Sequence, residues 1–137
     1  MDNLGIIVPF YNEKTTLEKS IERLLAQNIF SEIILSDDNS NDGSDKIAKH
    51  YEKTYKKIKY IKSATNKGKG NALNNAKNLI TSKFVAIHDA DLEYFAEDLV
   101  EMFEIVKENP NSLIIGSRFI GDKQRTNIYR STLIANK

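Results

Sequence analysis

The stretch that decides the fold is FVAIHDAD at residues 84–91, a short apolar run followed at once by two aspartates. An apolar run of this length with polar boundaries is typical of a buried strand. In open α/β sheets, ligands bind at the carboxyl ends of the strands. We therefore predict a strand over residues 84–88 that presents Asp89 and Asp91 at a ligand-binding edge.

Similar apolar runs recur on both sides of this stretch, at residues 4–8, 32–36, 58–61 and 113–116. Segments with apolar side chains at helical spacing separate them. This alternation predicts an α/β fold, with a mostly parallel sheet and helices on both faces.

Local signals place the boundaries of several elements. Pro9 is expected to stop the first strand. A capping box from Thr15 to Glu18 predicts the start of the first helix. Asp42 or Ser44 is expected to cap the second helix.

Composition limits the possible classes of protein. The chain has 137 residues, the size of one domain, with 40% hydrophobic and 28% charged residues. Its net charge of +1 gives no support for a nucleic-acid partner. Cysteine is absent, so any metal must be bound by oxygen or imidazole. The amino terminus lacks the pattern of a signal peptide, which predicts a soluble, cytoplasmic chain.

Asp89 and Asp91 have two interpretations. Two carboxylates beside a strand end suit a hard cation such as Mg²⁺, which also takes substrate phosphates as ligands. Alternatively, one aspartate caps the following helix. Spacing alone does not separate a metal–diphosphate site from a cap.

Other polar residues are expected at the same edge. Asp37 and Asp38 follow the second strand, where they suit either a base or ribose contact or an Asx turn. Glycines around Lys67 and Lys69 precede a helix, which suits an approach to phosphate or a plain turn. This loop lacks the spacing of an ATPase P-loop. Arg118 offers a guanidinium to a diphosphate or is a surface arginine, whereas His88 is expected to be structural and His50 to lie on a helix surface.

Five motifs follow one another along the chain: VPFYNE at 8–13, ILSDDNSNDGS at 34–44, NKGKGNA at 66–72, DADLEY at 89–94 and GSRF at 116–119. Their order and spacing resemble those of the family 2 glycosyltransferases, which have a Rossmann-like GT-A fold for nucleotide sugars. Within this family, the chain most resembles the polyprenyl-phosphate glycosyltransferases of bacterial cell-envelope biosynthesis. These enzymes form the branch that is similar to dolichyl-phosphate mannose synthase.

The resemblance implies roles for individual residues. The implied nucleotide-binding set is Pro9, Tyr11, Glu13, Asp38, Lys67, Lys69, Asp89 and Ala90. Asp89 and Asp91 would hold Mg²⁺ or Mn²⁺ against the diphosphate, and Arg118 would steady a phosphate, so these three are the implied catalytic residues. The metal would neutralise charge on the departing nucleoside diphosphate.

The resemblance also implies a domain layout. Residues 1–120 would form the donor-binding domain, and residues 121–137 a loop and the start of an acceptor-side interfacial helix. Members of this branch continue further, so the chain resembles a truncated member whose full-length form acts at the cytoplasmic face of the membrane. Asn39 replaces the usual glycine of the DDGS motif, and asparagine tolerates the same left-handed backbone. An open sheet edge would allow a homo-oligomer.

The implied reaction moves a sugar from a UDP- or GDP-linked donor, with inversion, to a polyprenyl phosphate or a saccharide. A truncated, non-catalytic nucleotide-binding or assembly module would carry the same motifs. A phosphoacceptor receiver domain would instead need its acidic pair after the first strand and a lysine after the fifth. In this chain the first predicted strand ends in Pro9 and Phe10, and the fifth ends in Ser117 and Arg118, which does not fit a receiver domain.

Overall fold

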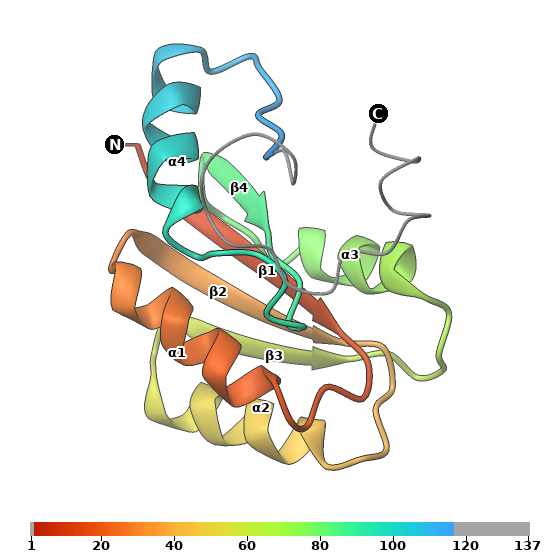
Figure 1. Ribbon diagram of the computed structural model, residues 1–137. Coiled ribbons are helices and arrows are strands. Elements are labelled where there is room, and N and C mark those ends of the chain that lie inside the picture. Colours follow the sequence, from red (N-terminus) through yellow and green to blue (C-terminus); the bar gives the residue numbers. More distant parts are fainter. Residues whose placement is uncertain (1, 117–137) are drawn as a thin grey trace, which may run out of the picture.

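The computed structural model describes residues 2–116, which form alternating strands and helices (Figure 1). The elements are β1 Leu4–Phe10, α1 Leu17–Gln27, β2 Phe30–Asp37, α2 Ser44–Thr54, β3 Ile58–Lys62, α3 Lys69–Lys77, β4 Phe84–Ile87 and α4 Asp98–Glu108. The strands form one parallel sheet in the order β3-β2-β1-β4. The chain steps outward from β1 to β3 and then returns to the other side of β1, so the strand order reverses between β1 and β4.

The sheet is covered on both faces, which confirms the predicted fold class. Alternate residues of a strand point to opposite faces. Val8 and Leu35 belong to a core shared with α1, α2 and α4, whereas Ile7 and Ile34 pack with Ala76 of α3. Figure 1 shows α1 and α2 on one side of the sheet and α3 on the other.

The first strand continues through Pro9, so the prediction that proline ends it is wrong. The backbone of Ile7 accepts a hydrogen bond from His88 N on the β4 side, and that of Phe10 accepts one from Asp38 N on the β2 side. Backbone groups of successive residues point alternately to the two neighbouring strands, so the backbone nitrogen of Pro9 points toward β4, as that of Ile7 does. The last residue of β4, Ile87, pairs with Ile7. No ladder partner therefore remains for the N–H that proline lacks.

Residues 113–116 were predicted as a fifth strand, and this prediction is also wrong. Within residues 2–116 the sheet has four strands. The side chains of Leu113 and Ile115 are 84% and 79% exposed. Apolar and β-branched composition favours a strand only where a neighbouring strand and a packed face receive it. In the described part of the chain, this segment has neither.

The first helix begins without the predicted capping box. Its N-cap is Thr16, and no side chain caps the helix. Instead, Thr16 Oγ1 donates to Glu13 Oε2 at 2.7 Å, and Leu17 N donates to the Glu13 carbonyl at 2.8 Å. A turn that begins at Glu13 therefore leads into α1.

The amino end of the sheet is fixed by a buried carboxylate, Glu32. Its Oε1 accepts the backbone N–H groups of Thr81 at 2.7 Å and Ser82 at 2.6 Å. Burial raises the pKa of Glu32, but the hydrogen bonds from Ser82 and Thr81 outweigh burial and hold the pKa below its ordinary value. This contact ties the α3–β4 connection to β2, at the end of the sheet opposite the predicted site. No helix in residues 2–116 has the length and apolar character that a membrane span requires.

Candidate functional site

A cleft of about 340 Å³ opens at the carboxyl edge of the sheet, where the strand order reverses. Loops after β1, β2 and β4 and the start of α3 form its walls. The lining residues are Pro9, Phe10, Tyr11, Glu13, Asp38, Asn66, Gly68, Lys69, Ala72, Asp89, Ala90 and Asp91. Parallel topology therefore gathers segments that are far apart in the sequence.

Most of the residues that the sequence singled out line this cleft. Lys67 does not; its backbone supports Asp38 instead. Arg118 lies outside the described residues. The sequence reasoning missed Phe10, Asn66, Gly68 and Ala72 as lining residues. All four lie inside the motifs at 8–13 and 66–72. Their place in these motifs, next to predicted site residues, could have identified them as lining residues.

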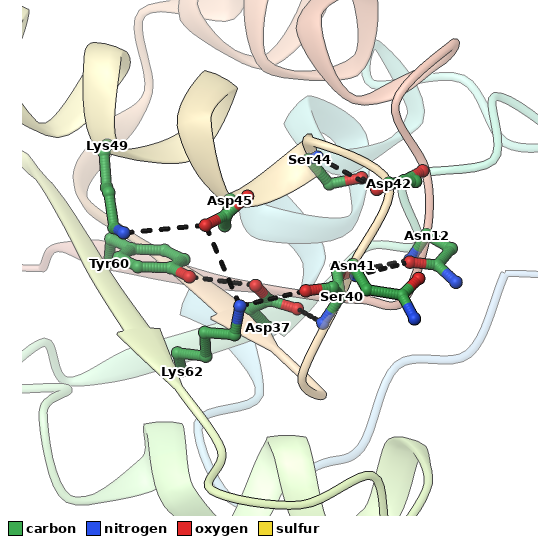
Figure 2. A network of polar contacts seen from close by, with 10 residues as sticks. All are labelled: Asn12, Asp37, Ser40, Asn41, Asp42, Ser44, Asp45, Lys49, Tyr60 and Lys62. Atoms are coloured by element: carbon green, nitrogen blue, oxygen red, sulfur yellow. Dashed lines mark hydrogen bonds and ion pairs between the residues drawn. The ribbon is translucent and has the colours of Figure 1, made fainter.

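The loop between β2 and α2 is held by Asp37, which is fully buried. Asp37 Oδ1 accepts the N–H of Ser40 at 2.7 Å, and Oδ2 accepts the hydroxyl of Tyr60 at 2.9 Å (Figure 2). Burial and the bond to Asp37 raise the pKa of the Tyr60 hydroxyl, which therefore stays protonated as the donor. Lys62 Nζ also donates to the Ser40 carbonyl at 2.9 Å. Asp37 is thus a structural residue of the site, not a cleft residue.

A second set of bonds joins this loop to the loop after β1 (Figure 2). Asn12 N donates to Ser40 Oγ at 2.9 Å, and Asn12 Oδ1 accepts the N–H of Asn41 at 2.9 Å. Asn12 and Asn39 both have left-handed backbone, with φ of 52° and 69°. Asparagine tolerates this region better than other residues with a side chain. The left-handed conformation expected at Asn39 is confirmed, and two walls of the cleft are fastened together.

The N-cap of α2 is Gly43 and no side chain caps the helix, so the predicted caps, Asp42 or Ser44, are wrong. Asp42 instead holds the turn before the helix. Its Oδ1 accepts the backbone N–H of Ser44 at 2.9 Å, and its Oδ2 accepts that of Lys14 at 3.0 Å. Burial raises the pKa of Asp42, but the bonds from Ser44 and Lys14 outweigh it and lower the pKa overall. Asp42 therefore stabilises the turn that precedes α2 and adds a further link to the loop after β1.

Asp38 lines the cleft and also anchors the glycine-rich loop. Its side chain is 3% exposed. Oδ1 accepts the N–H of Lys67 at 3.1 Å, and Oδ2 accepts that of Gly68 at 2.6 Å. Gly68 has φ of 93°, and a Cβ there would meet nothing within 4 Å, so backbone conformation and not space favours glycine. Asp38 thereby sets the position from which α3 begins.

Asp89 and Asp91 lie in the loop after β4 and line the cleft together. Both oxygens of Asp89 contact Lys69 Nζ, at 2.6 Å for Oδ1 and 2.8 Å for Oδ2. Asp91 Oδ1 accepts the N–H of Glu93 at 3.0 Å. The next helix, α4, has Glu97 as its N-cap. The alternative in which one of these aspartates caps the following helix is therefore wrong, although Asp91 does stabilise a local turn.

The chemistry of the two carboxylates suits a shared cation. Hard divalent cations bind carboxylate oxygens and complete their shell with water and substrate phosphates. Within residues 2–116, no cluster of three or more His, Cys, Asp or Glu side chains could hold a metal alone. Asp89 and Asp91 fit a cation that arrives with phosphate ligands, and not a closed structural site.

His88 is 5% exposed and does not line the cleft. Burial lowers its pKa, although Asp89 and Asp91 oppose this shift. His88 is therefore neutral at pH 7, and it is the structural histidine that the sequence predicted. His50 lies exposed on α2, also as expected.

Comparison with known proteins identifies the family. The chain matches the model of glycosyl transferase family 2 over residues 5–136. It is 32% identical to the GalNAc(5)-diNAcBac-PP-undecaprenol beta-1,3-glucosyltransferase of Campylobacter jejuni, over 79% of this chain and 36% of that protein. It is 29% identical to the dolichol-phosphate mannosyltransferase of Pyrococcus furiosus, over 85% of this chain and 33% of that protein. The chain thus spans less than half the length of these relatives.

A solved structure agrees with this assignment. The mannosyltransferase PcManGT from Pyrobaculum calidifontis, in complex with GDP-Man and Mn²⁺, superposes with a TM-score of 0.60 at 28% identity. The superposition covers 65% of this chain and 27% of that one. The fold is that of GT-A glycosyltransferases. The chain belongs to the family 2 glycosyltransferases.

Proposed function

We propose that this chain is the donor-binding part of an enzyme that transfers a sugar from a UDP- or GDP-linked donor to a polyprenyl phosphate. The cleft carries the proposal, because Tyr11 and Asp38 line the same continuous space as Asp89 and Asp91. A nucleotide sugar carries a base, a central diphosphate and a terminal sugar, so a single such ligand needs contacts for a base and for a diphosphate within one space.

The nucleoside would lie against Pro9, Tyr11 and Glu13. Tyr11 is 44% exposed, which leaves it accessible to a base. Because the bonds of Asn12 to Ser40 and Asn41 hold the loops of this pocket together before a ligand arrives, little conformational entropy is lost when the nucleoside binds.

Asp89 and Asp91 would hold Mg²⁺ or Mn²⁺ together with the diphosphate of the donor. When bound, such an ion neutralises charge on the departing nucleoside diphosphate. The residues fit this role because both offer hard oxygen ligands into the same cleft. Lys67, Lys69 and Arg118 are the residues proposed to meet phosphate groups of the donor or the acceptor.

A polyprenyl-phosphate acceptor is supported by the dolichol-phosphate mannosyltransferase among the relatives, and a polyprenyl-linked saccharide by the undecaprenol-linked glucosyltransferase. A phosphate acceptor is already an anion and can attack without a protein base. Attack from the side opposite the diphosphate would invert the anomeric carbon, and the anomeric configuration of the product measures this.

A thermal-shift panel tests donor binding directly. UDP- and GDP-sugars are expected to raise the melting temperature only with Mg²⁺ or Mn²⁺ present. Asp91→Ala should abolish this metal-dependent shift. The matched control Glu104→Gln also removes one acidic charge, from an exposed ion pair on α4, and should retain the shift. If Asp91→Ala binds metal and nucleotide as the wild type does, the site assignment is wrong.

Turnover separates the enzyme from a non-catalytic module. With donor, metal and a polyprenyl phosphate, an active chain releases nucleoside diphosphate. Binding without release would assign this chain to donor binding alone and contradict its catalytic role.

A further inference from the structure

The ammonium of Lys69 occupies the place at Asp89 that a divalent cation would need. Its Nζ lies 2.6 Å and 2.8 Å from the two carboxylate oxygens, so it bridges both. A bound Mg²⁺ sits about 2.0–2.1 Å from its oxygen ligands. An ammonium and a divalent cation therefore compete for the same oxygens and repel each other at such distances.

Lys69 is well placed to move. It is the first residue of α3, and its side chain is 54% exposed, compared with 27% for Asp89. Asp89 is its only ion-pair partner within residues 2–116. Lysine carries its charge on a flexible four-carbon stem, so a small rotation of the side chain would free the carboxylate.

In the part of the chain that the structure describes, Asp91 differs from Asp89. Within residues 2–116 it has no ion-pair partner, and its contact is the backbone N–H of Glu93. Lys69 thus compensates one of the two proposed metal ligands, the one nearer to β4 in the sequence. Both Lys69 and Asp89 line the cleft proposed for the donor.

We propose that Lys69 is a displaceable counter-ion that couples cation binding to donor binding. Without donor, Lys69 neutralises Asp89 and weakens the binding of a lone divalent cation. The diphosphate of the donor offers Lys69 a new anionic partner, so that cation and nucleoside diphosphate bind together. This inference rests on the proposed function, since it assigns the order of events at the same site.

The proposal predicts effects of opposite sign from one substitution. Lys69→Gln removes the competing charge, so Mn²⁺ alone should bind about two- to fivefold more tightly, as expected for an exposed ion pair. The same variant deprives the diphosphate of a cation, so UDP or GDP at saturating Mn²⁺ should bind about tenfold more weakly. By linkage, the cooperativity between Mn²⁺ and nucleotide must then fall.

The experiment measures Mn²⁺ affinity without nucleotide, from the electron paramagnetic resonance of free Mn²⁺, and UDP and GDP affinity by calorimetry. Lys83→Gln is the matched control, because Lys83 pairs with Asp2 at 2.7 Å and is 55% exposed, away from the cleft. Lys69→Arg keeps the charge and should not gain affinity for Mn²⁺.

Three outcomes decide the matter. Tighter Mn²⁺ and weaker nucleotide binding in Lys69→Gln, with wild-type values in Lys83→Gln, support the proposal. Unchanged or weaker Mn²⁺ binding in Lys69→Gln overturns it, while the wild type still binds nucleotide with metal and the proposed function stands. If even the wild type binds neither UDP nor GDP with Mn²⁺, the proposed function fails and this inference with it.

Discussion

Asp38→Asn tests whether Asp38 holds the glycine-rich loop in place. The carboxylate accepts one backbone N–H on each oxygen, from Lys67 at 3.1 Å and from Gly68 at 2.6 Å. Asparagine has nearly the same shape but only one acceptor oxygen. Its amide N–H₂ would face the second backbone N–H, so one bond is lost and two donors oppose each other.

The expected loss follows from these contacts. A hydrogen bond to a charged group contributes about 1.5–3 kcal/mol. Residues 67 and 68 are exposed, so the freed N–H can turn to water, which favours the lower end of that range. A loss of about 1.5 kcal/mol makes local opening of the loop about tenfold more frequent. If the donor requires the closed loop, its affinity falls by up to the same factor.

Amide hydrogen exchange measured by NMR reads this opening residue by residue. Exchange at Lys67 and Gly68 should become about tenfold faster in Asp38→Asn. Asp42→Asn is the control, because Asp42 also accepts two backbone N–H groups in the same β2–α2 loop, but from Lys14 and Ser44. Unchanged exchange in Asp38→Asn, or equal acceleration in Asp42→Asn, would refute the assigned role of Asp38.

Two further substitutions test the contacts that hold the scaffold. Glu32→Gln should lower the free energy of unfolding at pH 7 by about 1–2 kcal/mol, because a charged acceptor of several bonds is lost. The folded-state pKa of Glu32 is lowered, so its stabilisation is present above the ordinary pKa of 4.5 and is lost as pH falls through the folded value. Urea titrations at pH 7 and pH 3.5 should therefore show the difference between wild type and variant shrinking at acid pH; a constant difference would contradict this. Tyr60→Phe leaves an oxygen of buried Asp37 without its donor and should cost about 1–3 kcal/mol, whereas Tyr55→Phe, at an exposed tyrosine, should cost almost nothing. Equal urea midpoints for these two variants would show that the Tyr60 bond contributes little.

The sequence predicted the elements that pack on both faces of the sheet, because burial leaves a periodic pattern. It failed where the outcome depends on a neighbour. Pro9 stays in β1 because β4 ends at Ile87, and the apolar run at 113–116 lacks a partner strand in residues 2–116. Neither fact is visible within the local stretch, since both depend on which strand lies alongside.

The same limit applies to the site. Strand ends were enough to predict which loops meet, because parallel topology brings them to one edge. They could not distinguish Asp37 from Asp38. These neighbours alternate in direction, so Asp37 turns to Tyr60 and Ser40 while Asp38 turns to the glycine-rich loop. Separating their roles required the partners of each carboxylate.

The acidic residues at this edge differ in how their negative charge is compensated. Like charges gathered at one edge repel one another unless hydrogen-bond donors or a cation compensate them. In the structure, Asp37, Asp38 and Asp42 each accept two or more hydrogen bonds, from backbone N–H groups or side-chain hydroxyls, and need no ion. Within residues 2–116, Asp89 forms an ion pair with Lys69, and Asp91 accepts one backbone N–H. Asp89 and Asp91 are therefore the residues that we propose bind a divalent cation, whereas Asp37, Asp38 and Asp42 place the loops around them.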